Sequence, residues 1–126
     1  MNIIRAKTAG FCFGVDRAVK LTYDLLADGH KVATLGPLIH NPQVVEDLEA
    51  KGALTCPDVA SVPDGYEVVI RSHGVPRSVY DELTVRGIHY HDATCPFVQK
   101  IQRIAAEAEK AGAVLLVAGD KTHPEV

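Results

Sequence analysis

Three cysteines and six histidines carry most of the reactive side chains in this chain of 126 residues. Cys12 lies in the run Gly10-Phe11-Cys12-Phe13-Gly14, and Cys95 directly precedes a proline. Glycines beside a cysteine let the backbone approach a ligand closely, which an inert buried cysteine does not require. Proline suits the first turn of a helix, so Cys95 is predicted to cap a helix over residues 97–111. Because the start of a helix stabilises a thiolate, both cysteines are candidate ligands or catalytic thiols.

Three histidines occupy similar positions before predicted helices. His40 precedes Asn41-Pro42, where the asparagine is predicted to be the N-cap and the proline the first helical residue. Pro76 is expected to begin the helix after the loop that holds His73, and His123 directly precedes another proline. Imidazoles at such places can neutralise a small anion or contact a substrate. The histidines without this context are interpreted as surface or packing residues: His30, His89 and His91.

The elements that must position these residues alternate between short β-rich runs and segments with helical apolar spacing. This alternation predicts an α/β fold with a mainly parallel sheet and helices on both of its faces. The carboxyl ends of parallel strands share one edge, where such folds bind ligands, so the candidate residues are expected to meet there. The predicted strands are residues 2–6, 31–35, 53–56, 67–71, 88–91 and 113–118, and the predicted helices lie around residues 15–26, 44–48, 79–83 and 97–111.

Composition narrows the class of protein. Apolar residues make up 47% and charged residues 23%, which is typical of a soluble globular protein and excludes a disordered chain. The net charge is −3 and no block of lysine and arginine occurs, so neither a nucleic-acid partner nor a membrane surface is indicated. The longest apolar stretch, residues 113–118, is far too short to span a membrane. No signal-like segment is visible, and we expect a cytoplasmic protein.

The cysteines leave several kinds of site open. Their odd number argues against a disulfide framework, and Cys56 on a predicted strand is expected to be a buried small hydrophobe. Zinc sites usually contain close cysteine pairs, whereas Cys12 and Cys95 lie far apart in the sequence. Isolated cysteines from separate structural units suit an iron–sulfur cluster between those units. The alternatives are a zinc-bound structural domain and a non-enzymatic, Rossmann-like module that binds an anion or diphosphate through histidines.

Five short motifs combine these candidate residues with their neighbours. They are Gly10-Phe11-Cys12-Phe13-Gly14-Val15-Asp16-Arg17-Ala18, His40-Asn41, Ser72-His73-Gly74-Val75, Asp92-Ala93-Thr94-Cys95-Pro96 and His123-Pro124-Glu125-Val126. In this order and spacing they resemble the N-terminal part of the LytB family, the 4-hydroxy-3-methylbut-2-enyl diphosphate reductases. The resemblance covers all 126 residues, but well under half of the family's usual length.

The resemblance implies three pseudo-symmetric α/β units arranged around a central iron–sulfur cluster. Residues 1–95 are expected to form the first unit, and residues 96–126 the start of a second unit that is truncated here. Residues 1–13 are expected to pair with the sheet of a last, C-terminal unit that is absent from this chain. The third cysteine ligand of the cluster would lie beyond Val126.

The resemblance also implies a reaction and a role for each candidate residue. The family removes the substrate hydroxyl with two electrons and forms isopentenyl and dimethylallyl diphosphate, the last step of the non-mevalonate route of isoprenoid biosynthesis. The cofactor is a 4Fe–4S cluster, and the electrons come from a donor such as ferredoxin or flavodoxin. We expect the 126-residue chain alone to be inactive. By motif, Cys12 and Cys95 would bind the cluster, His40 and His73 the diphosphate, His123 the substrate near its reacting end, and Glu125 would be the catalytic proton donor.

Overall fold

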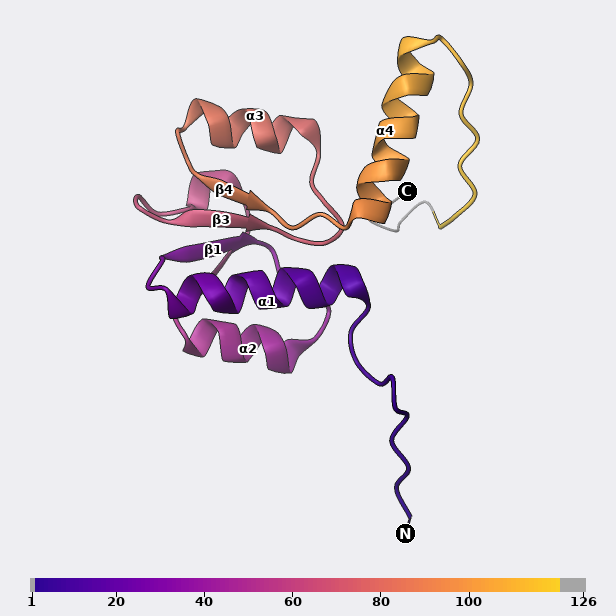
Figure 1. Cartoon of the computed structure of the whole chain (residues 1–126). Coiled ribbons are helices and arrows are strands. Elements are labelled where there is room, and N and C mark those ends of the chain that lie inside the picture. The colour runs from indigo at the N-terminus through magenta and orange to yellow at the C-terminus, as the bar shows by residue number, and fades with distance from the viewer. Residues whose placement is uncertain (1, 121–126) are drawn as a thin grey trace.

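A parallel sheet of four strands, in the order β2-β1-β3-β4, forms the centre of the computed structural model, which describes residues 2–120 (Figure 1). Strand β1 pairs with both β2 and β3, and β3 also pairs with β4, always in the parallel direction. This arrangement confirms the predicted α/β class. In chain order the elements are α1 (Phe13–Ala27), β1 (Val32–Leu35), α2 (Pro42–Ala50), β2 (Leu54–Cys56), the 3₁₀ turn η1 (Val59–Ser61), β3 (Glu67–Ile70), α3 (Arg77–Val85), β4 (Tyr90–Asp92) and α4 (Pro96–Lys110).

Helices cover both faces of the sheet, with α1 and α2 on one face and α3 on the other (Figure 1). Val32 and Val69 pack in one cluster with Ala18 of α1, whereas Val68 packs in a second cluster with Leu83 of α3. All five side chains are fully buried. Because both faces of the two central strands are covered, consecutive residues of β1 and β3 are mostly apolar. Each buried valine or leucine contributes roughly 1.5–3 kcal/mol to folding.

Proline is the first helical residue at two of the three places where the sequence predicts it, Pro42 and Pro96. The side chain of Asn41 accepts a hydrogen bond from the Val44 amide at 3.3 Å, and Pro42 is the first residue of α2. Cys95 is the N-cap of α4, as predicted. The prediction for Pro76 is wrong, because this residue is the N-cap of α3 and not its first helical residue. The proline ring fixes φ but leaves ψ able to adopt the extended value of a cap.

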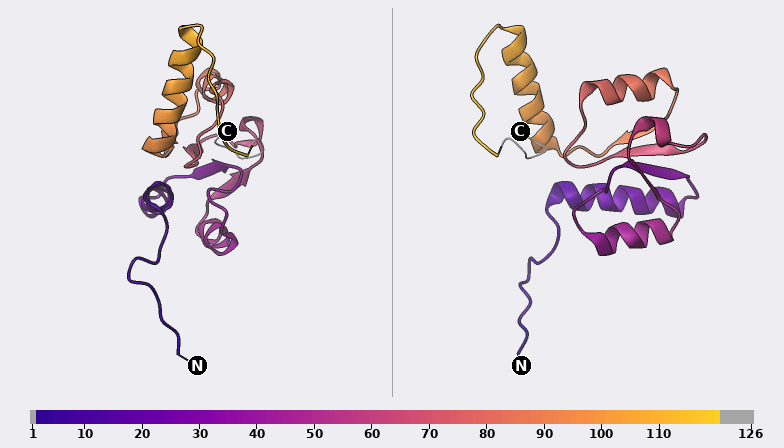
Figure 2. Two further views of the ribbon diagram at one scale, coloured as in Figure 1. Left: turned by 90° about the vertical axis from the view of Figure 1, so that its right-hand side faces the viewer. Right: turned by 180° about the vertical axis from the view of Figure 1, so that it is seen from behind.

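Two predicted strands are wrong in the described chain. Residues 2–6 and 113–118 are irregular, whereas the other four predicted strands are present with small shifts of their ends. A strand requires a hydrogen-bonded neighbour, and these two segments run outside the sheet, away from its edge strands β2 and β4 (Figures 1 and 2). Cys12 therefore follows an irregular segment and not a strand.

Helix α4 projects from the carboxyl end of the sheet and covers neither face (Figure 2). Val98 is its buried residue. Three large apolar side chains on this helix are exposed: Phe97 by 71%, Ile101 by 54% and Ile104 by 46%. None of the helices within residues 2–120 is long and apolar enough to cross a membrane.

Candidate functional site

Cys12 and Cys95 are the N-cap residues of α1 and α4, and neither side chain makes a capping hydrogen bond. The first turn of α1 lies directly against Cys95. A Cβ atom added to Gly14 would lie 2.8 Å from both the Cβ and the Sγ of Cys95. Only glycine allows this approach without displacement of the cysteine. Since Cys12 is two residues before Gly14, the two helix starts bring both thiols to the same edge of the sheet.

The turn that carries Cys95 is held from two sides. The guanidinium of Arg17 on α1 donates one hydrogen bond to the Thr94 carbonyl at 3.0 Å and another to the Asp92 carbonyl at 3.1 Å. On the other side, the Cys95 amide donates to the Ser72 carbonyl at 2.9 Å. The Asp92 side chain also accepts from the Thr94 amide at 2.9 Å. This set of bonds fixes Cys95 relative to α1 and to the loop after β3.

That loop carries His73, whose ring lies beside the ring of His40. The two ring centroids are 5.8 Å apart and the ring planes are inclined by 40°. Gly74 has a φ of +75°, and a Cβ there would lie 2.8 Å from Gln102 Nε2 and 3.2 Å from Thr94 Cγ2. The histidine loop therefore packs on the turn before Cys95 and on α4. The structure thus brings four predicted site residues to one edge: Cys12, His40, His73 and Cys95.

A pocket of about 430 Å³ borders His40 at the start of α2. Its walls are mainly apolar, with Ile39 and Val45 among them, and the capping residue Asn41 contributes a polar side chain. This volume lies within the range of about 300–1,000 Å³ that is typical of small-molecule sites. The start of α2 also presents backbone N–H groups, which favour an anion.

Arg71 is a candidate residue that the sequence interpretation missed. It follows β3 at the same edge, two residues before His73. Its Nε is buried and has no hydrogen-bond partner among the described residues. A buried donor without an acceptor costs free energy, so an anion beside Arg71 would stabilise this edge. The predicted strand over residues 67–71 includes Arg71, whereas β3 ends at Ile70. A basic residue directly after a strand is the feature of the sequence that could have indicated this site.

The remaining predicted residues are Cys56, which ends β2 with its side chain in a buried apolar cluster, and two residues outside the described chain. Cys56 is buried, and this burial raises the pKa of its thiol. Its Sγ contacts the Ser61 carbonyl at 3.7 Å, which confirms the expectation of a buried small hydrophobe. His123 and Glu125 lie outside residues 2–120, so their positions are not described.

Comparison with known proteins identifies the family to which this arrangement belongs. The family model described as LytB protein matches residues 3–126. The chain belongs to the LytB family. The 4-hydroxy-3-methylbut-2-enyl diphosphate reductase of Alkaliphilus oremlandii is 46% identical over 128 residues, which cover all of this LytB chain and 46% of the relative. The reductase of the same name from Trichlorobacter lovleyi is 47% identical over 126 residues, again all of this chain and 45% of the relative.

Solved structures show the same similarity. One is the structure of (E)-4-hydroxy-3-methyl-but-2-enyl diphosphate reductase, described as the terminal enzyme of the non-mevalonate pathway. It matches 98% of this LytB chain with a TM-score of 0.81 and 42% identity, over 44% of its own length. The E-1-hydroxy-2-methyl-but-2-enyl-4-diphosphate reductase of Plasmodium falciparum matches 94% of the chain with a TM-score of 0.86 and 28% identity, over 38% of its own length. The chain thus spans less than half the length of these relatives.

The thiols of this LytB chain suit an iron–sulfur group. Both cysteines lie at helix starts, where the backbone favours a thiolate. Neither side chain is used to cap its helix, Cys12 is exposed, and Cys95 is partly exposed. Thiolates are the usual ligands of such clusters. The donor chemistry and the contact at Gly14 therefore fit a shared metal group at this edge.

Proposed function

We propose that this chain supplies part of the active site of a 4-hydroxy-3-methylbut-2-enyl diphosphate reductase. The contact of Gly14 with Cys95 carries the proposal, because it brings the Cys12 and Cys95 helix starts together. The histidine pair on the same edge adds groups that suit an anionic substrate. The names of the similar proteins agree with this chemistry.

In this proposal Cys12 and Cys95 hold a 4Fe–4S cluster with a third thiolate that lies outside this chain. When bound, the cluster supplies single electrons and an iron atom that accepts the substrate hydroxyl. The bonds from Arg17 on α1 and to the Ser72 carbonyl hold the backbone of the Cys95 turn against the start of α1. These bonds keep the ligands in place before any substrate arrives.

The diphosphate end of the substrate is proposed to lie beside His40 and His73. Protonated imidazoles neutralise phosphate oxygens, and the backbone N–H groups at the start of α2 add positive partial charge. The Nε of Arg71, which has no hydrogen-bond partner within residues 2–120, lies after the adjacent strand and offers a further donor to an anion there. This combination binds a small dianion without a basic surface, in agreement with the net charge of −3.

The residues after Asp120 carry the proposed proton chemistry. Removal of the hydroxyl breaks the C–O bond, consumes two electrons and two protons, and releases water. His123 is proposed to contact the substrate near this bond, and the Glu125 carboxyl to give a proton to the departing hydroxyl oxygen. A one-electron donor protein such as ferredoxin or flavodoxin would provide the electrons. The division into a first unit of residues 1–95 and a second that begins at residue 96 is part of the same proposal.

A chimera tests this function. The chain replaces the matching 46% of the Alkaliphilus oremlandii reductase, and the product is purified and loaded with iron and sulfide without oxygen. We expect iron and sulfide to bind and the allylic diphosphate to be reduced. Cys12→Ser and Cys95→Ser should each abolish turnover, whereas Cys56→Ala should retain it because this thiol is buried in an apolar cluster.

The unfused 126-residue chain is the second arm of this experiment, and we expect it to be inactive under the same conditions. Turnover by the unfused chain would refute that expectation. Diphosphate binding that survives both serine substitutions, in a chimera without turnover, would favour the anion-binding module instead. Zinc without iron or sulfide in the anaerobically purified protein would support a zinc-bound structural domain if that zinc is lost on Cys12→Ser or Cys95→Ser.

A further inference from the structure

A second group of ionisable side chains lies at the amino end of the sheet, opposite the cysteine edge. Glu67 is the first residue of β3, and His91 is in β4 with His89 just before that strand. His30 precedes β1, which lies on the other side of β3. Three neighbouring parallel strands therefore each bring at least one of these residues to the same place. The reductase chemistry proposed above uses none of them.

The four side chains are in close contact. One carboxylate oxygen of Glu67 lies 2.7 Å from His91 Nε2, and the other lies 3.0 Å from His30 Nδ1. The rings of His89 and His91 are perpendicular, with centroids 4.8 Å apart. One ligand atom from each of Glu67, His89 and His91 lies within 4.8 Å of the other two.

Strand geometry explains why these three residues converge. His89 and His91 are two positions apart, so their side chains lie on the same side of the sheet. The register pairs Val69 with His91, which places Glu67 opposite the start of β4 on that same side. A change of one residue in this register would turn the glutamate away from the histidines.

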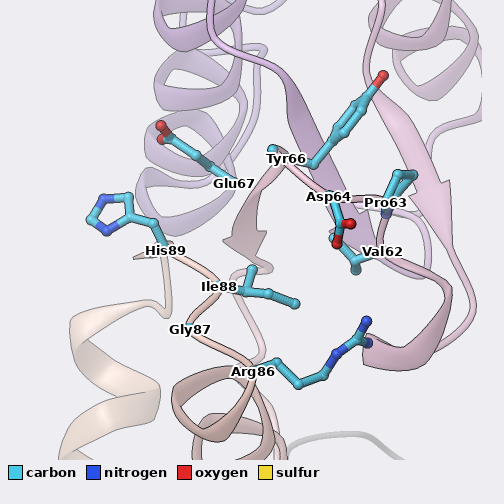
Figure 3. Close-up of a pocket in the computed structure, with 10 residues that line it drawn as sticks. Val62, Pro63, Asp64, Tyr66, Glu67, Arg86, Gly87, Ile88 and His89 are labelled. Atoms are coloured by element: carbon cyan, nitrogen blue, oxygen red, sulfur yellow. The ribbon is translucent and has the colours of Figure 1, made fainter.

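The group is accessible to an ion from solution. The side chains of Glu67 and His91 are 26% and 23% exposed, and His89 is exposed. Glu67 and His89 also line a pocket of about 410 Å³ whose other walls include Asp64 and Arg86. Figure 3 shows Glu67 and His89 on one rim of this pocket, with both side chains directed to the same side, away from the other labelled side chains.

The donor set is that of a transition-metal site. Two imidazoles and a carboxylate suit zinc, which often takes three protein ligands and leaves a fourth position for water. Ligand atoms on one tetrahedral zinc are about 3.3 Å apart, so small side-chain rotations would close this group around an ion.

We propose that Glu67, His89 and His91 form a zinc-binding site at the amino end of the sheet, separate from the cysteine edge. Glu67 binds the ion through one carboxylate oxygen in place of its present contact with His91. His30 holds the other oxygen and orients the carboxylate, as residues behind metal ligands commonly do. The ion would link β3 to β4 and stabilise the folded chain.

Isothermal titration with zinc chloride tests the site. The chain carries Cys12→Ser, Cys56→Ala and Cys95→Ser, so that no thiol competes for the ion. We expect one zinc ion per chain and a higher Tm in the presence of zinc. Removal of a ligand in His91→Ala or His89→Ala should weaken binding by more than about tenfold, and His30→Ala by about tenfold. His40→Ala is the matched control from the opposite end of the sheet and should leave the affinity unchanged.

A second measurement covers the case in which the triple variant does not fold. In the unaltered, reduced chain, histidine ring nitrogens are followed by NMR during the zinc titration. We expect the signals of His89 and His91 to shift together at one equivalent. The proposal is wrong if those rings do not respond to zinc, or if zinc affinity survives His89→Ala/His91→Ala. Loss of zinc binding in His40→Ala would also overturn it.

Discussion

At the scale of single residues, two glycines flank Cys12 but meet very different surroundings. A Cβ at Gly14 would collide with the Cβ and Sγ of Cys95, whereas a Cβ at Gly10 would meet nothing within 4 Å. The collision is with atoms near the backbone of Cys95, so a side-chain rotation cannot fully relieve it. Gly14 is therefore a packing requirement of the site, and Gly10 is not.

Gly14→Ala is expected to lower the unfolding free energy by about 1–2 kcal/mol. Overpacking costs roughly 1–3 kcal/mol, which exceeds the gain of about 0.5–1 kcal/mol that alanine normally brings to a helix. Chemical denaturation of Gly14→Ala and of the matched variant Gly10→Ala measures the difference. A Gly14→Ala chain that is more stable than the parent chain would show that α1 does not contact Cys95 as described.

At the residue scale, the sequence predicted the helix caps but not the contacts between distant side chains. The prolines correctly located the N-caps Asn41 and Cys95, since capping is a local property of the chain. Contacts between residues far apart in the sequence could not be predicted in this way. His30, His89 and His91 showed no local pattern, because their contact with Glu67 depends on the register of three strands. The burial of Arg71 Nε likewise depends on how the loops after the strands pack.

At the scale of elements, Arg17 connects α1 to the turn between β4 and α4. Its two hydrogen bonds are accepted by backbone carbonyls that lie 77 and 75 residues later in the chain. Lys20, one turn later on the same helix, instead forms an exposed ion pair with Asp24 at 3.1 Å. The two cations thus differ in whether they join separate elements.

Arg17→Ala is expected to destabilise the chain by about 2–3 kcal/mol, because hydrogen bonds from charged donors contribute about 1.5–3 kcal/mol and partial exposure reduces their sum. Lys20→Ala should cost less than about 0.5 kcal/mol, since exposed ion pairs contribute little. Thermal and denaturant unfolding measure both, and hydrogen exchange at the Thr94 and Cys95 amides reports on the turn. Equal losses in the two variants, with no change in exchange, would contradict the role given to Arg17.

At the scale of the whole molecule, the sequence predicted the parallel sheet covered by helices, but it also predicted two strands that the sheet does not contain. Apolar runs identified the central strands β1 and β3, because helices of the same chain bury these strands on both sides. The edge strands β2 and β4 are less buried, but they were also predicted. Residues 2–6 and 113–118 carry similar patterns, but no described strand lies beside them. Strand formation depends on a neighbour, and a local pattern does not reveal whether that neighbour is present.

Helix α4 and the segment 113–118 leave apolar side chains exposed on this chain. Ile101 and Ile104 of α4 are about half exposed, at 54% and 46%, and several apolar residues of 113–118 are also exposed. Exposed apolar side chains of this kind promote association. We expect the chain to bind the dye ANS and to self-associate at high concentration.

Ile101→Glu/Ile104→Glu should reduce both the dye fluorescence and the association state measured by sedimentation. Lys100→Glu changes the charge of the same exposed helix without removal of an apolar side chain, and should leave dye binding nearly unchanged. A parent chain that is monomeric and does not bind the dye would show that α4 buries this surface in solution.

Cross-linking of Cys12 to Cys95 most directly tests whether the two thiols share one site. Because Gly14 touches Cys95 and lies two residues from Cys12, the sulfurs should be within about 14 Å of each other. The reduced Cys56→Ala chain is treated with a bifunctional thiol reagent of that span, and the peptides are identified by mass spectrometry. We expect one linked pair, Cys12 with Cys95, within a single chain. If each thiol reacts but no intramolecular link forms, the two cysteines cannot bind a common cluster and the proposed reductase site is wrong.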